Sequence, residues 1–302
     1  DVTDLLDSLF IGYDKRLRPN YKGQPVIVGV TLHIIKFSSI SEANMDFTIE
    51  FFFVQHWTDD RLKFDSSTFN ITSHELYISN VMLDKLWWPD TFFANAKNAK
   101  FHEATARNMF LKLSENGTVT LSIRLTVVVS CMMDLTYFPM DKQICSLVIE
   151  SYAYSTRHIA YNWLGRADQS VTTNNNCQMI EAKVIGIKVI NKTTILSTGL
   201  FSSLSCLFYL KRNLIYYIIH TYMPSTLIVV SSWLSFWLPK DAGPARIALG
   251  ITTVLTITTL MSASNASLPK ISYLKSIDLY TITCFLFIFA SIVEYAIVSY
   301  VS

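Results

Sequence analysis

The chain has 302 residues, a net charge of +2 and a charged share of only 16%, against an average of about 25% in proteins. This nearly balanced charge gives no indication of a nucleic acid or of a strongly acidic partner. The shortage of charge is local. Residues 213–302 carry only seven charged side chains, whereas the preceding part has the composition of an ordinary soluble domain.

The first part of the chain has the pattern of a short helix followed by many strands. Residues 1–12 place apolar side chains on one helical face, behind a capping Thr3 or Asp4. Beyond Pro25, apolar residues recur at every second position, which is typical of strands. Such runs occupy residues 26–32, 45–54, 76–82, 109–113, 118–129, 143–150, 179–191 and 200–211. Many short strands separated by turn signals, such as Asn116-Gly117, predict a β-sandwich.

Cys131 and Cys145 bracket thirteen residues. A disulfide between them would close a loop of about 15 residues and remove about 3 kcal/mol of unfolded-state entropy. Such bonds persist in oxidising compartments, so the loop places the first two-thirds of the chain outside the cell. Its tip, Phe138-Pro139-Met140, is apolar and is expected to rest on another part of the molecule.

Three sequons, at Asn70, Asn116 and Asn191, are predicted glycosylation sites and agree with an extracellular location. Among the other cysteines, Cys284 is expected to be a small buried hydrophobe. A hairpin turning near Ile195 would place Cys206 opposite about Ile185, which argues against a bond to Cys177. No cysteine or histidine spacing predicts a metal site, and no cofactor is expected.

Three apolar segments follow, at residues 214–238, 244–263 and 275–301. The first is long enough to cross a bilayer, and Pro224 is expected to kink it. Prolines 239 and 244 break the chain before the second segment. Because the disulfide and the sequons place the amino-terminus outside, the carboxy-terminus is predicted to lie inside.

The second segment is unusual because it carries five threonines. Helical spacing aligns one stripe of residues, namely Ala248, Thr252, Leu255, Thr259 and Ser262. A spanning helix with one narrow, mostly small and polar face indicates that this face meets water. The single leucine then predicts a hydrophobic constriction that gates by dewetting. The alternative is that the hydroxyls bond the preceding turn or neighbouring helices.

One helix cannot enclose a pore, so this interpretation requires an oligomer with closed symmetry. Each subunit would place Arg246 at the cytoplasmic mouth, beside Gly243, Pro244 and Ala245, which offer no carboxylate. Acidic rings select cations, whereas basic surroundings suit anions, so the pattern favours chloride. Arg246 could instead anchor the helix at the membrane interface.

Several motifs together resemble those of the pentameric ligand-gated ion channels, the Cys-loop receptors, and the chain is most similar to their anion-selective branch of glycine-, GABA- and glutamate-gated channels. They are the Cys loop with Phe138-Pro139-Met140-Asp141, Trp87-Trp88-Pro89-Asp90, Phe92-Phe93-Ala94-Asn95, Pro244-Ala245-Arg246, Leu249-Gly250-Ile251-Thr252-Thr253-Val254-Leu255-Thr256 and Ala266-Ser267-Leu268-Pro269-Lys270. The resemblance covers essentially the whole chain.

The resemblance implies a mostly-β extracellular sandwich of about ten strands with an amino-terminal helix, followed by a helical transmembrane bundle. Residues 1–212 would form the ligand-binding domain and residues 213–302 the membrane domain of a multi-pass cell-membrane protein. The family has four membrane helices and three are predicted here, so the cytoplasmic loop and the fourth helix are expected to be missing from this sequence. The implied partners are four further subunits around a central pore, a small agonist, chloride and membrane lipid.

The resemblance also implies where an agonist binds, which is between adjacent sandwiches. The matching positions on the principal side are Phe93, Asn95, Glu150, Tyr152, Tyr154, Thr198 and Phe201. Those on the complementary side are Phe52, Val54, Leu111, Ser122 and Arg124. Aromatic rings with a carboxylate suit an ammonium group through cation–π attraction and ion pairing, although each aromatic could instead belong to the sandwich core.

Two departures from the amino-acid-gated relatives bear on the agonist. Those relatives have an arginine where Val54 stands, and the hairpin tip at residues 192–198 lacks their usual tyrosine. Arg124 could still hold a carboxylate, but an amine is an equally good candidate for the agonist.

For gating, the resemblance implies that the Phe138-Pro139-Met140 tip and the turn carrying Glu42 push on residues 265–273, which include Pro269. Arg212 could pair with Glu42 or Asp141. The alternatives are a binding subunit that does not conduct or conducts only with other subunits, and a cation-conducting orphan member of the same family. An enzyme is not expected, because six scattered histidines come with no catalytic motif.

Overall fold

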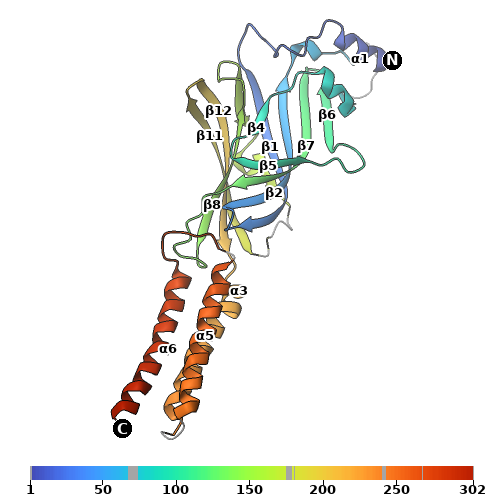
Figure 1. Cartoon of the computed structure of the whole chain (residues 1–302). Coiled ribbons are helices and arrows are strands. Elements are labelled where there is room, and N and C mark those ends of the chain that lie inside the picture. Colours follow the sequence, from blue (N-terminus) through green and yellow to red (C-terminus); the bar gives the residue numbers. More distant parts are fainter. Residues whose placement is uncertain are drawn as a thin grey trace.

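A computed structural model describes residues 2–66, 74–174, 179, 181–239, 243–266 and 268–301 of the chain. Figure 1 shows a β-rich part joined end to end to a bundle of long helices. The amino-terminus lies at the far end of the β part and the carboxy-terminus at the far end of the helices. Asn70 and Cys177, two of the positions singled out in the sequence, lie outside the described residues.

The β part begins with helix α1 (Val2–Phe10), as predicted. Its strands are β1 (Val26–Ser41), β2 (Asp46–Thr58), β3 (Glu75–Ile78), β4 (Thr91–Phe93), β5 (Ala96–Phe101), β6 (Met109–Ser114), β7 (Thr118–Ser130), β8 (Lys142–Ser151), β9 (Ile159–Trp163), β10 (Val171–Thr173), β11 (Ala182–Leu196) and β12 (Gly199–Arg212). Short helices occur at Asp60–Leu62, Asn80–Lys85 and α2 (Ala167–Ser170).

These strands form two sheets. One has the order β10-β1-β2-β7-β6-β3, with β5 also paired to β7 and β9 to β1, and the other has the order β11-β12-β8-β4. The predicted sandwich is therefore confirmed. All eight predicted runs contain strands, and β4, β5, β9 and β10 are additional ones of three to six residues.

The hydrophobic core lies between the sheets, and strand alternation explains which side chains enter it. In β1, every second residue from Val26 to Ile34 is buried. Irregularities in the pairing with β2 between Ile34 and Lys36 and between Phe37 and Ser39 then change which positions face inward. As a result Phe37 is buried, with its ring 5.2 Å from that of Phe208 in the opposite sheet.

The β11–β12 hairpin turns later than predicted. Leu196 pairs with Gly199, whose φ of 137° suits glycine, and a pairing irregularity lies between Val184 and Gly186. Cys206 consequently faces Val189, so the predicted turn near Ile195 and the predicted partner Ile185 are wrong. Cys206 is free and buried, and burial raises the pKa of its thiol to about 12.

The helical part follows β12 directly. A continuous helical run comprises α3 (Ile215–Tyr217), a π-helical turn (Ile218–Tyr222), α4 (Met223–Trp233) and a 3₁₀ turn (Leu234–Trp237). The π turn lies just before Pro224, which lacks an amide hydrogen, and the predicted kink at Pro224 stays a prediction. In the described part of the chain, α5 (Gly243–Ala266) and α6 (Ser276–Val301) are long and apolar enough to cross a membrane.

Helix α5 packs against α4 and α6 along one face only. Gly250, Thr253 and Ile257 on this face are buried. A Cβ added to Gly250 would lie 2.9 Å from Cγ1 of Ile292 in α6, so only glycine permits this close approach. The opposite face of α5 is exposed in the single chain.

Candidate functional site

The stripe predicted to line a pore lies on the exposed face of α5. All five of its members, Ala248, Thr252, Leu255, Thr259 and Ser262, are exposed, and 62% of the surface of Leu255 is accessible. The hydroxyls of Thr252 and Thr259 donate to carbonyls of the preceding turn, at 2.8 Å each. The hydroxyls therefore bond the preceding turn, as the alternative interpretation expects, while also lying on the exposed face. Such bonds leave the hydroxyl oxygens able to accept from water.

Pro244 and Ala245 are exposed at the amino end of α5, on the same side as the stripe, whereas Arg246 is half-buried. The Arg246 guanidinium donates to the Leu238 carbonyl and lies 5.7 Å from the centre of the Tyr295 ring in α6. These are the contacts expected of an anchor at the helix end. The proposal that Arg246 also contributes positive charge to a pore mouth depends on the assembled protein.

The predicted disulfide between Cys131 and Cys145 is present, and both residues are buried. In the loop that it closes, Phe138 and Pro139 are buried, whereas Met140 at the tip is exposed. The Phe138 ring packs edge-on against Tyr217 of α3, with ring centres 5.0 Å apart. The apolar tip therefore rests on the helical part through Phe138.

The same loop also satisfies the first backbone donors of α6, a connection that the sequence did not indicate. The amides of Ser276 and Ile277 donate to the carbonyls of Thr136 and Phe138, at 2.9 and 3.2 Å. The Leu135 amide donates to the Tyr273 hydroxyl at 3.0 Å. Since the first amides of a helix lack partners within it, the loop caps α6 in addition to contacting α3.

Removing the Tyr273 hydroxyl by Tyr273→Phe is expected to lower the free energy of unfolding by about 1–3 kcal/mol, because the buried amide of Leu135 would lose its partner. Denaturant unfolding of the purified protein measures the change. Tyr300→Phe, on an exposed tyrosine near the carboxy end of α6, is the control and should unfold like wild type. Equal values for the two variants would contradict this role of the Tyr273 hydroxyl.

A buried ion-pair network joins the sandwich to the start of the helices. Arg212, the last residue of β12, donates to Asp141 Oδ1 at 2.8 Å and also to Glu42 in the β1–β2 turn. It thus pairs with both predicted partners. Its guanidinium carbon lies 4.7 Å from the Phe138 ring. Burial alone would lower the pKa of Arg212, but Asp141 and Glu42 outweigh it and raise the pKa, so the side chain stays charged.

On the β4–β8–β12 sheet, aromatic side chains and one carboxylate gather near the hairpin. The Phe92 ring packs edge-on against Tyr152 at 5.5 Å, and 78% of the surface of Tyr152 is accessible. Phe92 pairs with Glu150 across the strands. The Glu150 carboxylate is buried and accepts a hydrogen bond of 2.8 Å from Thr194 of β11. Such a grouping fits a cation.

Other predicted members of this group are placed less directly. Phe201 is buried on β12, next to Thr198 in the exposed hairpin turn. Tyr154 is half-buried, with its ring 6.4 Å from Trp87. Pro269, assigned to coupling, is half-buried in the segment between α5 and α6.

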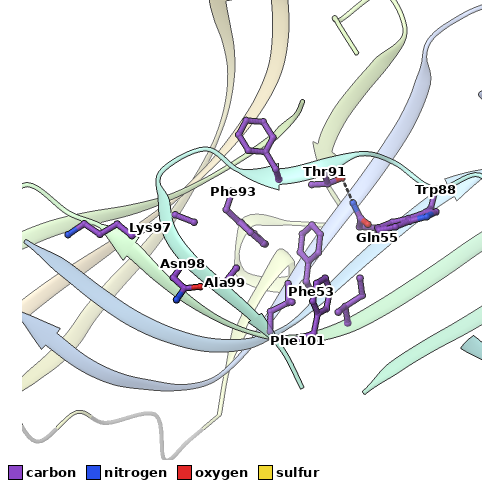
Figure 2. A pocket seen from close by; sticks show the side chains of 13 residues that line it. Phe53, Gln55, Trp88, Thr91, Phe93, Lys97, Asn98, Ala99 and Phe101 are labelled. Carbon is purple, nitrogen blue, oxygen red and sulfur yellow. Dashed lines mark hydrogen bonds between the residues drawn. The ribbon is translucent and has the colours of Figure 1, made fainter. Parts of the chain in front are cut away.

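Two predicted residues on this side make contacts within the sandwich. Phe93 points between the sheets, 5.6 Å from Phe51 and 5.4 Å from Phe53 (Figure 2), because neighbouring residues in a strand face opposite ways. Phe92 takes the outward position, and strand alternation relative to Phe93 was the signal for it. The Asn95 amide donates to the Ser146 carbonyl at 2.7 Å and accepts from the Val148 amide, so it fastens the turn after β4 to β8.

The predicted complementary side lies on the other sheet. Phe52 and Val54 of β2 and Ser122 and Arg124 of β7 are exposed or half-buried on its outer surface. Leu111 has only 1% of its surface accessible and belongs to the core, so that prediction is wrong. Its neighbour Phe110 is 39% accessible and pairs with Ser122 across the strands.

Arg124 already has a carboxylate partner. Its Nε donates to Glu50 Oε1 at 2.8 Å, and Lys36 lies 3.4 Å from the other oxygen of Glu50. Burial raises the pKa of Glu50, but Arg124 and Lys36 outweigh this and hold the pKa below its usual value. A ligand carboxylate at Arg124 would therefore have to compete with Glu50, a charged neighbour that the sequence analysis missed.

Of the predicted glycosylation sites, Asn116 and Asn191 have exposed side chains, as glycan attachment requires. His102 shares a 2.8 Å hydrogen bond with Thr126. Within the described ranges, no group of three or more histidine, cysteine, aspartate or glutamate side chains is placed to hold a metal ion.

Comparison with known proteins agrees with this arrangement. A model of the neurotransmitter-gated ion-channel ligand binding domain matches residues 2–214, and a model of the neurotransmitter-gated ion-channel transmembrane region matches residues 221–302. The chain is 43% identical over 300 residues to gamma-aminobutyric acid receptor subunit beta-4 from Gallus gallus, an alignment that covers 99% of this chain. The chain spans 60% of the length of that curated relative.

Proposed function

Because the chain belongs to the neurotransmitter-gated ion-channel family, we propose that it is a subunit of an agonist-gated chloride channel. Its family makes it an integral membrane protein with the sandwich outside the cell, and a family of channels does not favour the enzyme alternative. We place the boundary between the two parts after Arg212, where β12 ends and the helices follow.

One observation carries the proposal of a pore. The face of α5 that carries the hydroxyl stripe is exposed in the single chain, although the helix lies in the membrane-spanning part. Small polar side chains gain no favourable interaction from contact with lipid, so this face is better suited to contact with water. Several copies arranged around an axis would turn the stripes inward and bring Leu255 into a constricting ring.

Among the described residues, the inner end of this stripe carries no acidic side chain, which supports anion selectivity. Ala245 and Pro244 are exposed there, and the half-buried Arg246 follows them in the helix. A ring of carboxylates would attract cations, whereas this ring is neutral with a positive flank. Chloride is therefore the proposed ion.

The two halves of the proposed agonist site lie on different sheets of the sandwich, which supports an oligomer. The Phe92, Glu150 and Tyr152 group lies on the β4–β8–β12 sheet, whereas Phe52 and Arg124 lie on the outer surface of the other sheet. Only two copies, or two related subunits, can bring these surfaces together around one ligand. A ring of five is the arrangement proposed from the family.

The principal side suits the ammonium group of an agonist. Gamma-aminobutyric acid is the first candidate, because the relative from Gallus gallus is named as its receptor subunit. Its carboxylate would need a partner on the complementary side, where Val54 is apolar and Arg124 is paired with Glu50. Simple amines without a carboxylate are thus the second candidates, and a panel of both classes separates them.

Replacing Ala245 with glutamate is expected to change the selectivity of the channel from anions to cations. The substitution puts one carboxylate per subunit at the exposed inner end of α5. Whole-cell recording in reduced external chloride gives the readout. The wild-type reversal potential should shift by about 59 mV per tenfold change in chloride, whereas that of Ala245→Glu should follow sodium instead.

Ala248→Ser, one turn further along the same exposed stripe, adds polarity without charge and should leave the wild-type reversal potential unchanged. A wild-type reversal potential that does not change with the chloride concentration would contradict the proposed selectivity. Surface protein without current for every agonist, alone and with related subunits, would contradict the channel itself. Current only with related subunits would favour the alternative of an obligate heteromer.

A further inference from the structure

Three lysines lie side by side at the end of the sandwich that meets the helices. In the pairing of β12 with β8, Lys211 stands opposite Lys142, and in the pairing of β11 with β12 it stands opposite Lys183. Opposite residues of antiparallel strands have Cβ atoms about 4.5–5.5 Å apart. These residues therefore form one row across three adjacent strands, which we call the lysine row.

The lysine row faces outward. The residue next to each lysine in the chain, namely Asp141, Ala182 or Arg212, is buried, and Arg212 donates to Asp141 on the inner side. Because neighbouring residues of a strand point to opposite faces of the sheet, the lysines point away from the sandwich. All three are exposed, so their ammonium groups can reach a binding partner.

The described part of the chain supplies no ion pair to the lysine row. Elsewhere on the sandwich, Lys97 lies 2.8 Å from Asp46 and Lys112 lies 2.7 Å from Glu75. The other ion-paired lysines of the described residues also lie outside the row. Since like charges directly opposite each other destabilise a sheet, a row of three unpaired lysines is best explained by an anion that binds to it.

The position of the row indicates which kind of anion this is. Lys211 precedes the last residue of β12, and helix α3 begins at Ile215. Figure 1 shows the helices continuing away from this end of the sandwich. Tyr216 in α3 is 63% accessible and belongs to a residue type that collects at the headgroup layer of membranes. The lysine row is therefore expected to lie at the level of the lipid headgroups.

The neighbouring surface is consistent with a lipid. The next outward row, farther from the helices, consists of Ile144, Tyr209 and Gly186 and carries no charge. The positive charge thus forms one line along the membrane edge of the sheet, whereas an elongated soluble polyanion is better matched by a broad basic surface. Glu181, an exposed residue just before β11, offers one carboxylate against three ammonium groups.

We propose that the lysine row binds the phosphate of an anionic phospholipid in the leaflet that borders the sandwich. Ammonium groups form charge-assisted hydrogen bonds with phosphate oxygens. Each lysine near an anionic membrane surface contributes roughly fivefold in affinity. An uncharged headgroup carries its own cation beside the phosphate, so it gains less from the row.

Binding can be tested on the purified full chain in an uncharged detergent, with native mass spectrometry to count bound lipids. The probes are dioleoyl phosphatidylglycerol, which is anionic, and dioleoyl phosphatidylcholine, which has the same acyl chains and no net charge. Wild type should bind phosphatidylglycerol at least about tenfold more tightly. The combined variant Lys142→Gln, Lys183→Gln and Lys211→Gln should lose at least about tenfold of this affinity and bind phosphatidylcholine as before.

The matched control combines Lys22→Gln, Lys100→Gln and Lys188→Gln, which remove three charges from exposed lysines outside the row. It should bind phosphatidylglycerol like wild type. A second variant replaces the three lysines of the row with arginine and should keep the preference for the anionic lipid. Because this variant retains the charge, it distinguishes a loss of charge from a loss of folding.

Equal affinity of wild type for the two lipids would overturn the proposal, and so would equal affinity of the glutamine row variant and its control for phosphatidylglycerol. A heparin fragment whose binding depends on the row, while phosphatidylglycerol binding does not, would assign the row to a soluble polyanion and equally overturn it. These measurements use neither agonist nor current, so their failure is distinguishable from failure of the channel proposal.

Discussion

Arg212→Gln is expected to remove nearly all channel protein from the cell surface. The substitution leaves the buried carboxylate of Asp141 and the half-buried carboxylate of Glu42 without their shared cation. Breaking a buried pair in this way costs about 3–5 kcal/mol, which is a large part of the stability of a typical domain. Surface labelling and the midpoint of thermal unfolding of the purified protein measure the effect.

Lys211→Gln is the matched control for this prediction, because Lys211 precedes Arg212 on the same strand and is exposed. The double variant Arg212→Gln with Asp141→Asn should recover part of the surface protein, since one of the stranded charges is gone. If Arg212→Gln reached the surface in wild-type amounts and unfolded at the same temperature, the ion pairs of Arg212 would not stabilise the junction between the sandwich and the helices.

With gamma-aminobutyric acid as the proposed agonist, Glu150→Gln is expected to raise its concentration for half-maximal current about 10- to 100-fold. A hydrogen bond to a charged group contributes about 1.5–3 kcal/mol, and each 1.4 kcal/mol is tenfold in affinity. The amide keeps the shape of the side chain and can still accept from Thr194, so the loss isolates the negative charge. Dose–response recording on surface-expressed channels provides the measurement.

Glu103→Gln serves as the control for charge removal, because that carboxylate is exposed and forms an ion pair with Arg107, four residues away. Its dose–response curve should match wild type. An unchanged curve for Glu150→Gln would show that the agonist ammonium does not bind beside Glu150.

Much of the fold could be predicted from the sequence, because strands and helices repeat their apolar residues at regular intervals. Alternating apolar residues predicted eight of the strand regions, and the apolar segments predicted the helices. The strands that were missed, such as β4 and β10, have only three residues each. Three residues are too few to show a period of two, so such strands form only because a neighbouring strand supplies their hydrogen bonds.

The candidate site depends on strand parity. Leu111 is in the core whereas its neighbour Phe110 is exposed, and Phe93 packs on Phe51 and Phe53 whereas Phe92 packs on Tyr152. The environments of Phe93 and Leu111 depend on which face of each strand points toward the opposite sheet. Sequence spacing alone does not fix that choice in a stretch such as Phe92-Phe93, where both residues are aromatic.

Partners distant in sequence were equally difficult to predict. The pairing of Arg124 with Glu50 spans 74 positions and that of Tyr273 with Leu135 spans 138. Both result from the packing of whole elements. By contrast, the pairing of Arg212 with Glu42 and Asp141 could be proposed because the family places those segments at one junction.

The central claim is that the hydroxyl stripe of α5 surrounds water in the assembled protein. It is tested most directly by cysteine accessibility, with a negatively charged, membrane-impermeant thiol reagent applied during agonist-evoked current. Thr252→Cys and Thr259→Cys, on the exposed stripe, should be modified and the current blocked, whereas Thr253→Cys and Ile257→Cys, on the buried face, should be protected. Block at the buried pair with protection of the stripe would contradict the account.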